Sequence, residues 1–253
     1  MIKPHTKIIL QEISTAIRAT SGCVAPLFHV SEYGTPQLLG SSVLIDISGN
    51  ILLCTAKHVL ETAQSPLHFN GPSSLEILHG EFYRSQHHDI AVLLLTLGQI
   101  RSFQKYTPLP ESRIANQTQT EACHYVEFIG YPETKNRVLP NKYKLPNRLY
   151  SFGCVKLRIS QDEVRFKFTK MNRDTKTNLR VKAPNLSGVS GGPIMGVSLS
   201  NASTIEGNPD PKLIGICTDH IKKSNEVFGP TVAILIAAIK EGWSIKLPSL
   251  LDR

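Results

Sequence analysis

A succession of short apolar segments, each ended by turn-forming residues, is the feature that most limits how this chain can fold. The segments "DIAVLLLTL" (89–97), "HYVEFIGYP" (124–132) and "KLIGICTD" (212–219) have the length and residue types of strands. Apolar and polar residues alternate in "EVRFKFT" (163–169), which predicts a strand that is buried on one face. Only residues 6–19 and 230–242 show a helical pattern. We therefore expect an all-β protein with a barrel or sandwich architecture.

Local patterns also indicate how the strands are organised. In "GSSVLIDISGNILLCTAKHV" (40–59), two apolar runs are separated by Ser48-Gly49-Asn50, which predicts a β-hairpin. Residues 106–121 lack a strand pattern, so we expect the boundary between two β units there. The apolar residues at helical spacing in 6–19 predict a short helix that docks onto the protein's own body. No apolar run has the length of a membrane span.

Composition places the chain among folded globular proteins. It has 253 residues, of which 41% are hydrophobic and 19% charged. Its five cysteines are odd in number and scattered, and neither a disulfide framework nor a paired zinc motif is visible. Gln11, Glu12 and Arg18 interrupt the apolar core that a signal peptide requires. We expect reduced thiols, a cytoplasmic protein and no metal site.

Positive charge is concentrated in one part of the chain. The formal net charge is +8, and residues 131–182 hold 14 of the 28 Lys and Arg residues. This basic segment (131–182) could serve as a docking surface for an acidic substrate, a nucleic acid or a partner protein. A solvated hairpin face is the favoured interpretation, because no aromatic ladder or nucleic-acid motif accompanies the charge.

Three segments carry residues suited to nucleophilic catalysis. His58 ends an apolar strand, Asp89 begins a buried strand, and Ser190 lies in the glycine-rich loop "SGVSGGPI" (187–194). A serine hydroxyl needs a general base to become nucleophilic, and histidine can act as that base near neutral pH. A carboxylate then holds the imidazole in the right tautomer and stabilises its charged form. Residues of all three types are present.

These motifs carry a family resemblance. The order His, Asp, Ser, with Thr-Ala-x-His, Asp-Ile-Ala-x-Leu and Gly-x-Ser-Gly-Gly-Pro, resembles the trypsin-like serine peptidases of the chymotrypsin fold over roughly residues 22–243. The resemblance implies two six-stranded antiparallel β-barrels with the site between them. We accordingly expect an N-terminal helix (1–21), a first barrel with His58 and Asp89 (22–115), a second barrel with Ser190 (116–230), and a C-terminal helix and tail (231–253).

The resemblance also implies roles for residues around the triad. The N–H groups of Gly188 and Ser190 would form an oxyanion hole. Thr218 would hydrogen-bond the triad carboxylate, and Asp219 and His220 would line the edge of the specificity pocket. Pro184 stands where an acid would select Lys or Arg, so cleavage after basic residues is not supported, although Asp219 still offers a carboxylate to a basic side chain.

Two departures from the secreted members refine the expectation. Val189 replaces the Asp that pairs with a newly cleaved N-terminus, and Val59 replaces the cysteine that usually follows the histidine. Both resemble bacterial and intracellular members, including the HtrA type, and we expect a catalytic domain of that type without its peptide-binding PDZ domain.

The sequence therefore predicts a serine endopeptidase that acts on proteins or peptides. We expect it to need no cofactor and to have no membrane partner. We expect its activity to be gated by a partner protein or a signal. The alternatives are a non-catalytic protein-binding module on the same fold and a nucleic-acid-binding protein that uses the basic segment.

Overall fold

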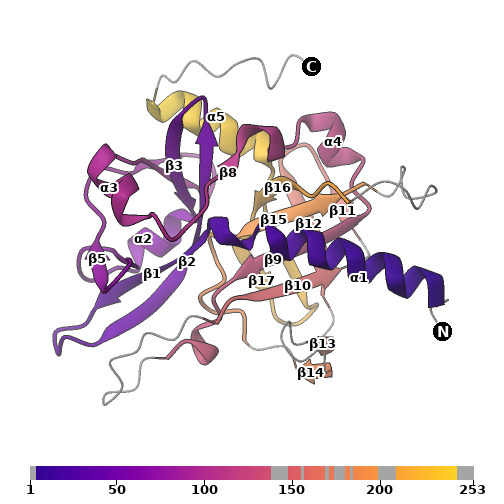
Figure 1. Ribbon diagram of the computed structural model, residues 1–253, viewed down its shortest axis with the longest axis horizontal. Coiled ribbons are helices and arrows are strands. Elements are labelled where there is room, and N and C mark those ends of the chain that lie inside the picture. The colour runs from indigo at the N-terminus through magenta and orange to yellow at the C-terminus, as the bar shows by residue number, and fades with distance from the viewer. Residues whose placement is uncertain are drawn as a thin grey trace.

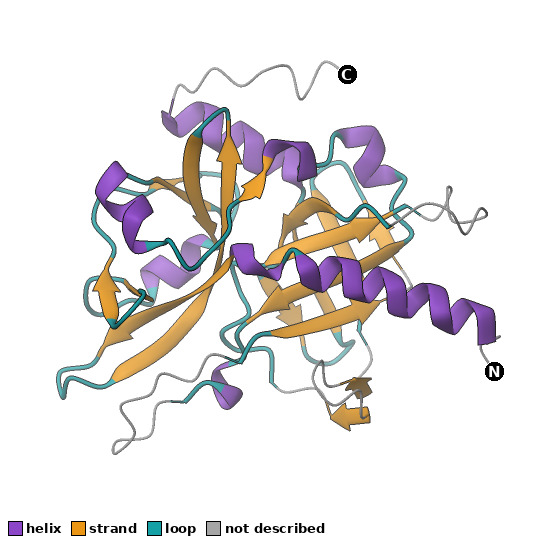
Figure 2. Cartoon of the chain, in the orientation of Figure 1, coloured by secondary structure: helices purple, strands orange, loops and turns teal. Residues whose placement is uncertain are grey.

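Antiparallel strands dominate the computed structural model, which describes residues 4–137, 148–154, 157–168, 171–173, 180–182, 185–198 and 209–243. Most of the described chain is strand and loop, with the helices placed around the strands (Figure 2). The prediction of an all-β protein is confirmed.

The first half of the chain forms one sheet, in which eight strands are described. Its order is β5-β4-β1-β2-β3-β7-β6, and β8 pairs in parallel with β2. Several of these strands are only two or three residues long, which is why the count exceeds the six that were expected. The strands are β1 Val24–Val30, β2 Pro36–Ile47, β3 Asn50–Thr55, β4 His68–Asn70, β5 Leu75–Ile77, β6 Tyr83–Arg84, β7 Ala91–Leu94 and β8 Leu109–Pro110.

The second half contains two four-stranded sheets, ordered β10-β9-β15-β16 and β11-β12-β18-β17 (Figure 1). A separate hairpin pairs β13 with β14. The segment "LYSFGCVKLRIS" (149–160) contains the two strands β10 and β11. The strands are β9 Tyr125–Gly130, β10 Tyr150–Cys154, β11 Leu157–Ile159, β12 Glu163–Lys167, β13 Met171–Arg173, β14 Arg180–Lys182, β15 Pro193–Val197, β16 Lys212–Ile216, β17 Asp219–Ile221 and β18 Glu226–Pro230.

The predicted hairpin joins β2 to β3. Ile47 pairs with Asn50, so the turn has two central residues, and both have positive φ (Ser48 53°, Gly49 82°). Such a turn matches the right-handed twist of the strands that it connects.

The expected terminal helices are present as α1 (Pro4–Ala19) and α5 (Val232–Trp243). The expectation that only the two ends are helical is wrong, because three short helices lie between them. Two of these begin with a capping box, formed by Thr96 with Gln99 and by Asn116 with Gln119. The remaining helical segments are α2 Lys57–Glu61, α3 Leu97–Ser102, α4 Gln117–Glu121, η1 Ser21–Cys23, η2 Glu111–Arg113 and η3 Glu133–Lys135.

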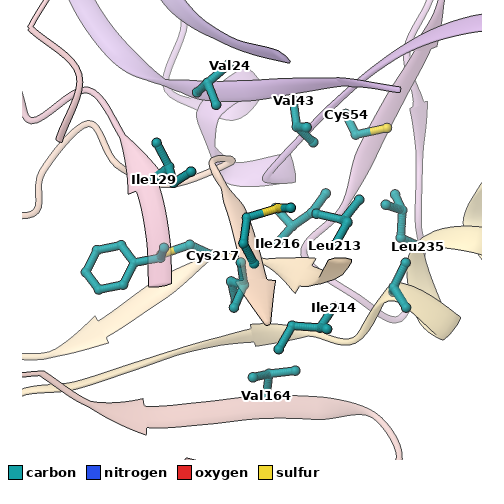
Figure 3. Close-up of a cluster of buried hydrophobic side chains, with 14 of the residues drawn as sticks. Val24, Val43, Cys54, Ile129, Val164, Leu213, Ile214, Ile216, Cys217 and Leu235 are labelled. Atoms are coloured by element: carbon teal, nitrogen blue, oxygen red, sulfur yellow. The ribbon is translucent and has the colours of Figure 1, made fainter. Parts of the chain in front are cut away.

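One buried hydrophobic cluster joins the two halves. Val24, Val43 and Cys54 of the first sheet gather with Ile129 and Ile216 of the second half (Figure 3). Helix α5 contacts β16 as well as β6 and β7, so it spans both halves. None of the described helices is long and apolar enough to cross a membrane.

Helix α1 contributes to the same cluster through Ile13 and Ile17, which are buried. The prediction that this helix docks onto the protein's own body is confirmed.

Candidate active site

His58 and Asp89 meet because β3 and β7 are paired. Thr55, at the end of β3, pairs with Ala91, at the start of β7. His58 follows β3 in α2, and Asp89 precedes β7, so the two side chains lie at the same end of the strand pair. His58 Nδ1 lies 2.6 Å from Asp89 Oδ2, and the His58 backbone N–H donates to Oδ1 at 2.9 Å.

These contacts shift both groups toward their charged forms. The hydrogen bond to Asp89 is the main cause that raises the pKa of His58; burial opposes it, and the charges of Asp89, Asp219 and Glu61 add to the rise. Burial by itself raises the pKa of Asp89. The hydrogen bonds from the His58 ring and from the backbone of His58 and Lys57 outweigh burial, so this pKa lies below its ordinary value.

The glycine-rich loop lies against the first sheet. Gly191 has φ +89°, and a Cβ added there would lie 2.0 Å from the Ser41 carbonyl oxygen and 2.2 Å from Thr55 Oγ1. No side chain fits that space, which explains a glycine immediately after Ser190. The Ser190 carbonyl accepts the Ser41 N–H at 2.7 Å. The loop is therefore held beside the strand that leads to His58.

In this structure the Ser190 hydroxyl makes its hydrogen bond to a group other than His58. Its Oγ donates to the Thr218 carbonyl at 3.2 Å. Within the described ranges, it makes no hydrogen bond to His58 Nε2. The structure thus joins His58 to Asp89 directly, and the serine–histidine hydrogen bond is not made. Such bonds are often long before substrate binds.

Most backbone N–H groups of the loop are engaged within the protein. Val189 donates to Leu186, Gly191 to Cys217, and Gly192 to Val189. Among the residues that the structure describes, the N–H groups of Gly188 and Ser190 donate to no protein group. Gly188 has φ +88°, a conformation that side chains rarely adopt. These are the two donors that the sequence motif assigned to an oxyanion hole.

Comparison with known proteins identifies the architecture. No family model matches the sequence, and no curated protein matches it. The structure is similar to the Rv3671c protease from M. tuberculosis in its active form, with a TM-score of 0.53, 11% identity, and coverage of 93% of this chain and 87% of that chain. It is also similar to a serine-to-alanine form of the HtrA-type protease AlgW with a tripeptide, with a TM-score of 0.51, 16% identity, and coverage of 92% and 64%.

The protein has the chymotrypsin-like serine protease fold. In this chymotrypsin-like fold, the first half carries His58 and Asp89, and the second half carries Ser190. The seam between the halves is where the Ser190–Gly191 peptide lies against Ser41 and Thr55.

The structure describes Thr218, Asp219 and His220, three of the four residues expected around the specificity pocket. The Thr218 hydroxyl faces the Phe228 carbonyl at 3.5 Å, so the hydrogen bond to Asp89 that the resemblance implied is not made here. Asp219 is exposed at the start of the edge strand β17, and its Oδ1 accepts the His220 N–H at 2.6 Å. Pro184 lies outside the described residues.

His220 points into the protein, on the opposite face of β17 from Asp219. Its ring is tilted against Phe168, with 5.3 Å between the ring centroids. Burial, aided by the charge of Lys222, lowers the pKa of His220.

Two further observations concern metals and thiols. In the described part of the chain, no group of His, Cys, Asp or Glu side chains is placed to hold a metal ion. All five cysteines are buried, and none is in a disulfide.

Sequence reasoning missed Ser41, a buried serine that contacts the glycine-rich loop. The one available signal was the run Gly40-Ser41-Ser42 inside an otherwise apolar strand. Gly40 itself leaves room for Val59, whose side chain would lie 2.7 Å from an added Cβ.

Proposed function

We propose that this protein is a serine endopeptidase with a His58–Asp89–Ser190 triad. The observation that carries the proposal is the His58–Asp89 pair, in which one carboxylate holds both the ring Nδ1 at 2.6 Å and the backbone N–H of the same histidine at 2.9 Å. A carboxylate in this arrangement orients an imidazole with its Nε2 free to act as a base. The glycine-rich loop beside it carries the serine.

The reaction begins when the Ser190 hydroxyl turns from the Thr218 carbonyl to His58 Nε2. Ser190 Oγ attacks the scissile carbonyl, and His58 takes the hydroxyl proton. The N–H groups of Gly188 and Ser190 stabilise the oxyanion of the tetrahedral intermediate. His58 then gives its proton to the leaving amine, and water hydrolyses the acyl-enzyme by the same steps.

The hydrogen bond from the Ser190 hydroxyl to the Thr218 carbonyl also supports the proposal that the activity is gated. In the resting geometry the nucleophile donates to Thr218 at 3.2 Å rather than to its base. A partner protein or signal that favours the other rotamer would raise activity, and the basic segment is a candidate docking surface for such a partner. The buried cysteines, none of which is in a disulfide, fit an intracellular setting.

Covalent labelling by a fluorophosphonate probe tests the proposal. The wild type should gain one adduct at Ser190, and Ser190→Ala and His58→Ala should gain none, because the probe needs an activated serine. Ser187→Ala is the matched control, since Ser187 is an exposed serine of the same loop and its loss should leave labelling unchanged. Labelling that persists in Ser190→Ala, or a wild type that stays unlabelled even with unfolded protein added, would contradict a serine peptidase.

A further inference from the structure

Ser41 lies at the seam between the two halves of the protein, in strand β2. Its side chain has 0% exposure, so each of its polar atoms needs a partner inside the protein. Its hydroxyl donates to the Gly188 carbonyl at 2.8 Å and accepts the Tyr131 N–H at 2.9 Å. Its backbone N–H donates to the Ser190 carbonyl at 2.7 Å, and its carbonyl accepts Thr55 Oγ1 at 2.8 Å.

Two of the four partners of Ser41 are the carbonyls of Gly188 and Ser190, the residues whose N–H groups the proposed mechanism uses. A glycine has no side chain to limit its φ and ψ, so a loop with Gly188, Gly191 and Gly192 must be held from outside. Peptide units are planar, and anchoring a carbonyl therefore fixes the direction of the N–H in the same unit. Ser41 anchors the unit that follows Gly188 and the unit that follows Ser190.

The peptide units that precede Gly188 and Ser190 are held by groups other than Ser41. The Ser187 carbonyl accepts the Glu133 N–H at 2.7 Å, and the Val189 carbonyl accepts the Gly192 N–H at 3.0 Å. These two units contain the Gly188 and Ser190 N–H groups themselves. The directions of the two donors therefore depend on both sets of anchors, and Ser41 supplies the set that comes from the first half of the protein.

Gly130 leaves room for the Ser41 hydroxyl to contact the loop. A Cβ added at Gly130 would lie 2.9 Å from Ser41 Oγ and 2.8 Å from Val189 Cγ1. The glycine at the end of β9 thus lets the strand approach both Ser41 and the loop.

We propose that Ser41 is a positioning residue, which holds the glycine-rich loop so that the Gly188 and Ser190 N–H groups converge on one point. The inference rests on the proposed peptidase function for its catalytic consequence. Ser41 itself touches no reacting atom; it acts through the loop.

Ser42 provides a matched control. It is the next residue of β2, it also has 0% exposure, and its hydroxyl also donates to a backbone carbonyl, that of Ala25 at 3.0 Å. That carbonyl belongs to β1, so this bond stays within the first sheet. Ser41→Ala and Ser42→Ala each remove one buried hydroxyl from the same strand, and only the first releases the loop.

The first measurement compares kcat and KM of both variants on a peptide ester. For Ser41→Ala we expect kcat to fall about 10- to 100-fold with KM changed less than about threefold, because an oxyanion donor acts mainly in the transition state. Inhibition by a peptide aldehyde, whose adduct carries an oxyanion, should weaken in parallel. Ser42→Ala should change kcat by less than about threefold. Equal losses in both variants, or a loss confined to KM, would overturn the positioning role.

The second measurement does not depend on catalysis. Amide hydrogen exchange over residues 186–192 should quicken in Ser41→Ala and stay at the wild-type rate in Ser42→Ala. Ser41→Cys replaces the hydroxyl by a slightly larger thiol that is a weaker donor, so its exchange rate should fall between those of serine and alanine, and it serves if Ser41→Ala does not fold. If the probe leaves the wild type unlabelled but exchange is faster in Ser41→Ala, the proposed peptidase function is refuted and the anchoring of the loop by Ser41 is supported. Unchanged exchange would refute the anchor whatever the activity.

Discussion

At the scale of single residues, Asp89 is the main influence that raises the pKa of His58, the base of the proposed triad. Its hydrogen bond is the first cause of the raised His58 pKa, and the more distant charges of Asp219 and Glu61 contribute less. The proposed mechanism needs neutral His58, so a raised pKa would move the acid limb of the activity profile to higher pH. Removing the Asp89 charge should move that limb back to lower pH.

We therefore expect Asp89→Asn to lower kcat by about 10⁴-fold, because the amide no longer selects the productive tautomer. The residual activity should show its acid limb at lower pH than the wild type. A pH profile of kcat/KM on a peptide ester measures both effects. Asp219→Asn is the control: it should shift the limb in the same direction by a smaller amount and retain most of kcat. An unmoved limb in Asp89→Asn would contradict the pairing.

At the scale of elements, helix α5 joins the two halves through one buried face. Leu235 (Figure 3) has 0% exposure and belongs to the shared cluster, as does Ile239. The residue types of "VAILIAAI" (232–239) indicate a buried segment, but they do not say against which strands it packs.

Leu235→Ala should lower the free energy of unfolding by about 2–5 kcal/mol, because it leaves a cavity where both halves meet. Leu97→Ala is the matched control, since Leu97 is 80% exposed in α3 and its truncation should change stability by less than about 0.5 kcal/mol. Urea unfolding monitored by tryptophan fluorescence provides the comparison. Similar losses in the two variants would show that α5 does not join the halves.

The short helices show where local patterns were sufficient and where they were misread. Residues 116–121, "NQTQTE", lack a strand pattern, and in the structure Asn116 and Gln119 form a capping box that starts a helix there. The same spacing at Thr96 and Gln99 starts α3. Both signals are local and were readable from the sequence. The hairpin at Ser48 and Gly49 was read correctly because its turn residues determine their own conformation.

At the scale of the whole molecule, the five thiols are distributed through the interior. Burial raises the pKa of Cys23 and of Cys217 to about 12 and that of Cys123 to about 11, and it raises the pKa of Cys54 further. The thiolate is the reactive form, so these groups should be inert while the protein is folded.

We expect native protein to resist iodoacetamide at pH 8 and all five cysteines to be alkylated after unfolding in guanidinium. For the native protein, mass spectrometry after timed quenching gives the order in which the cysteines are slowly alkylated. Cys123, at 7% exposure, should react before Cys54, at 0%. The melting temperature should be the same with and without reductant, because no disulfide is present. Rapid native alkylation of Cys217, next to Thr218, would show instead that the site opens readily.

The sequence by itself determined the class of the fold and the identity of the chemical groups. Alternating and apolar runs specify strands through the two-residue period of the pleat, and a serine between glycines is recognisable without coordinates. Only the tertiary structure decided which of these groups touch. Ser41 and Gly188 are 147 residues apart in the chain, and the Ser190 hydroxyl finds Thr218, 28 residues away. Such hydrogen bonds depend on how distant strands close around one core, and no local pattern encodes that distance.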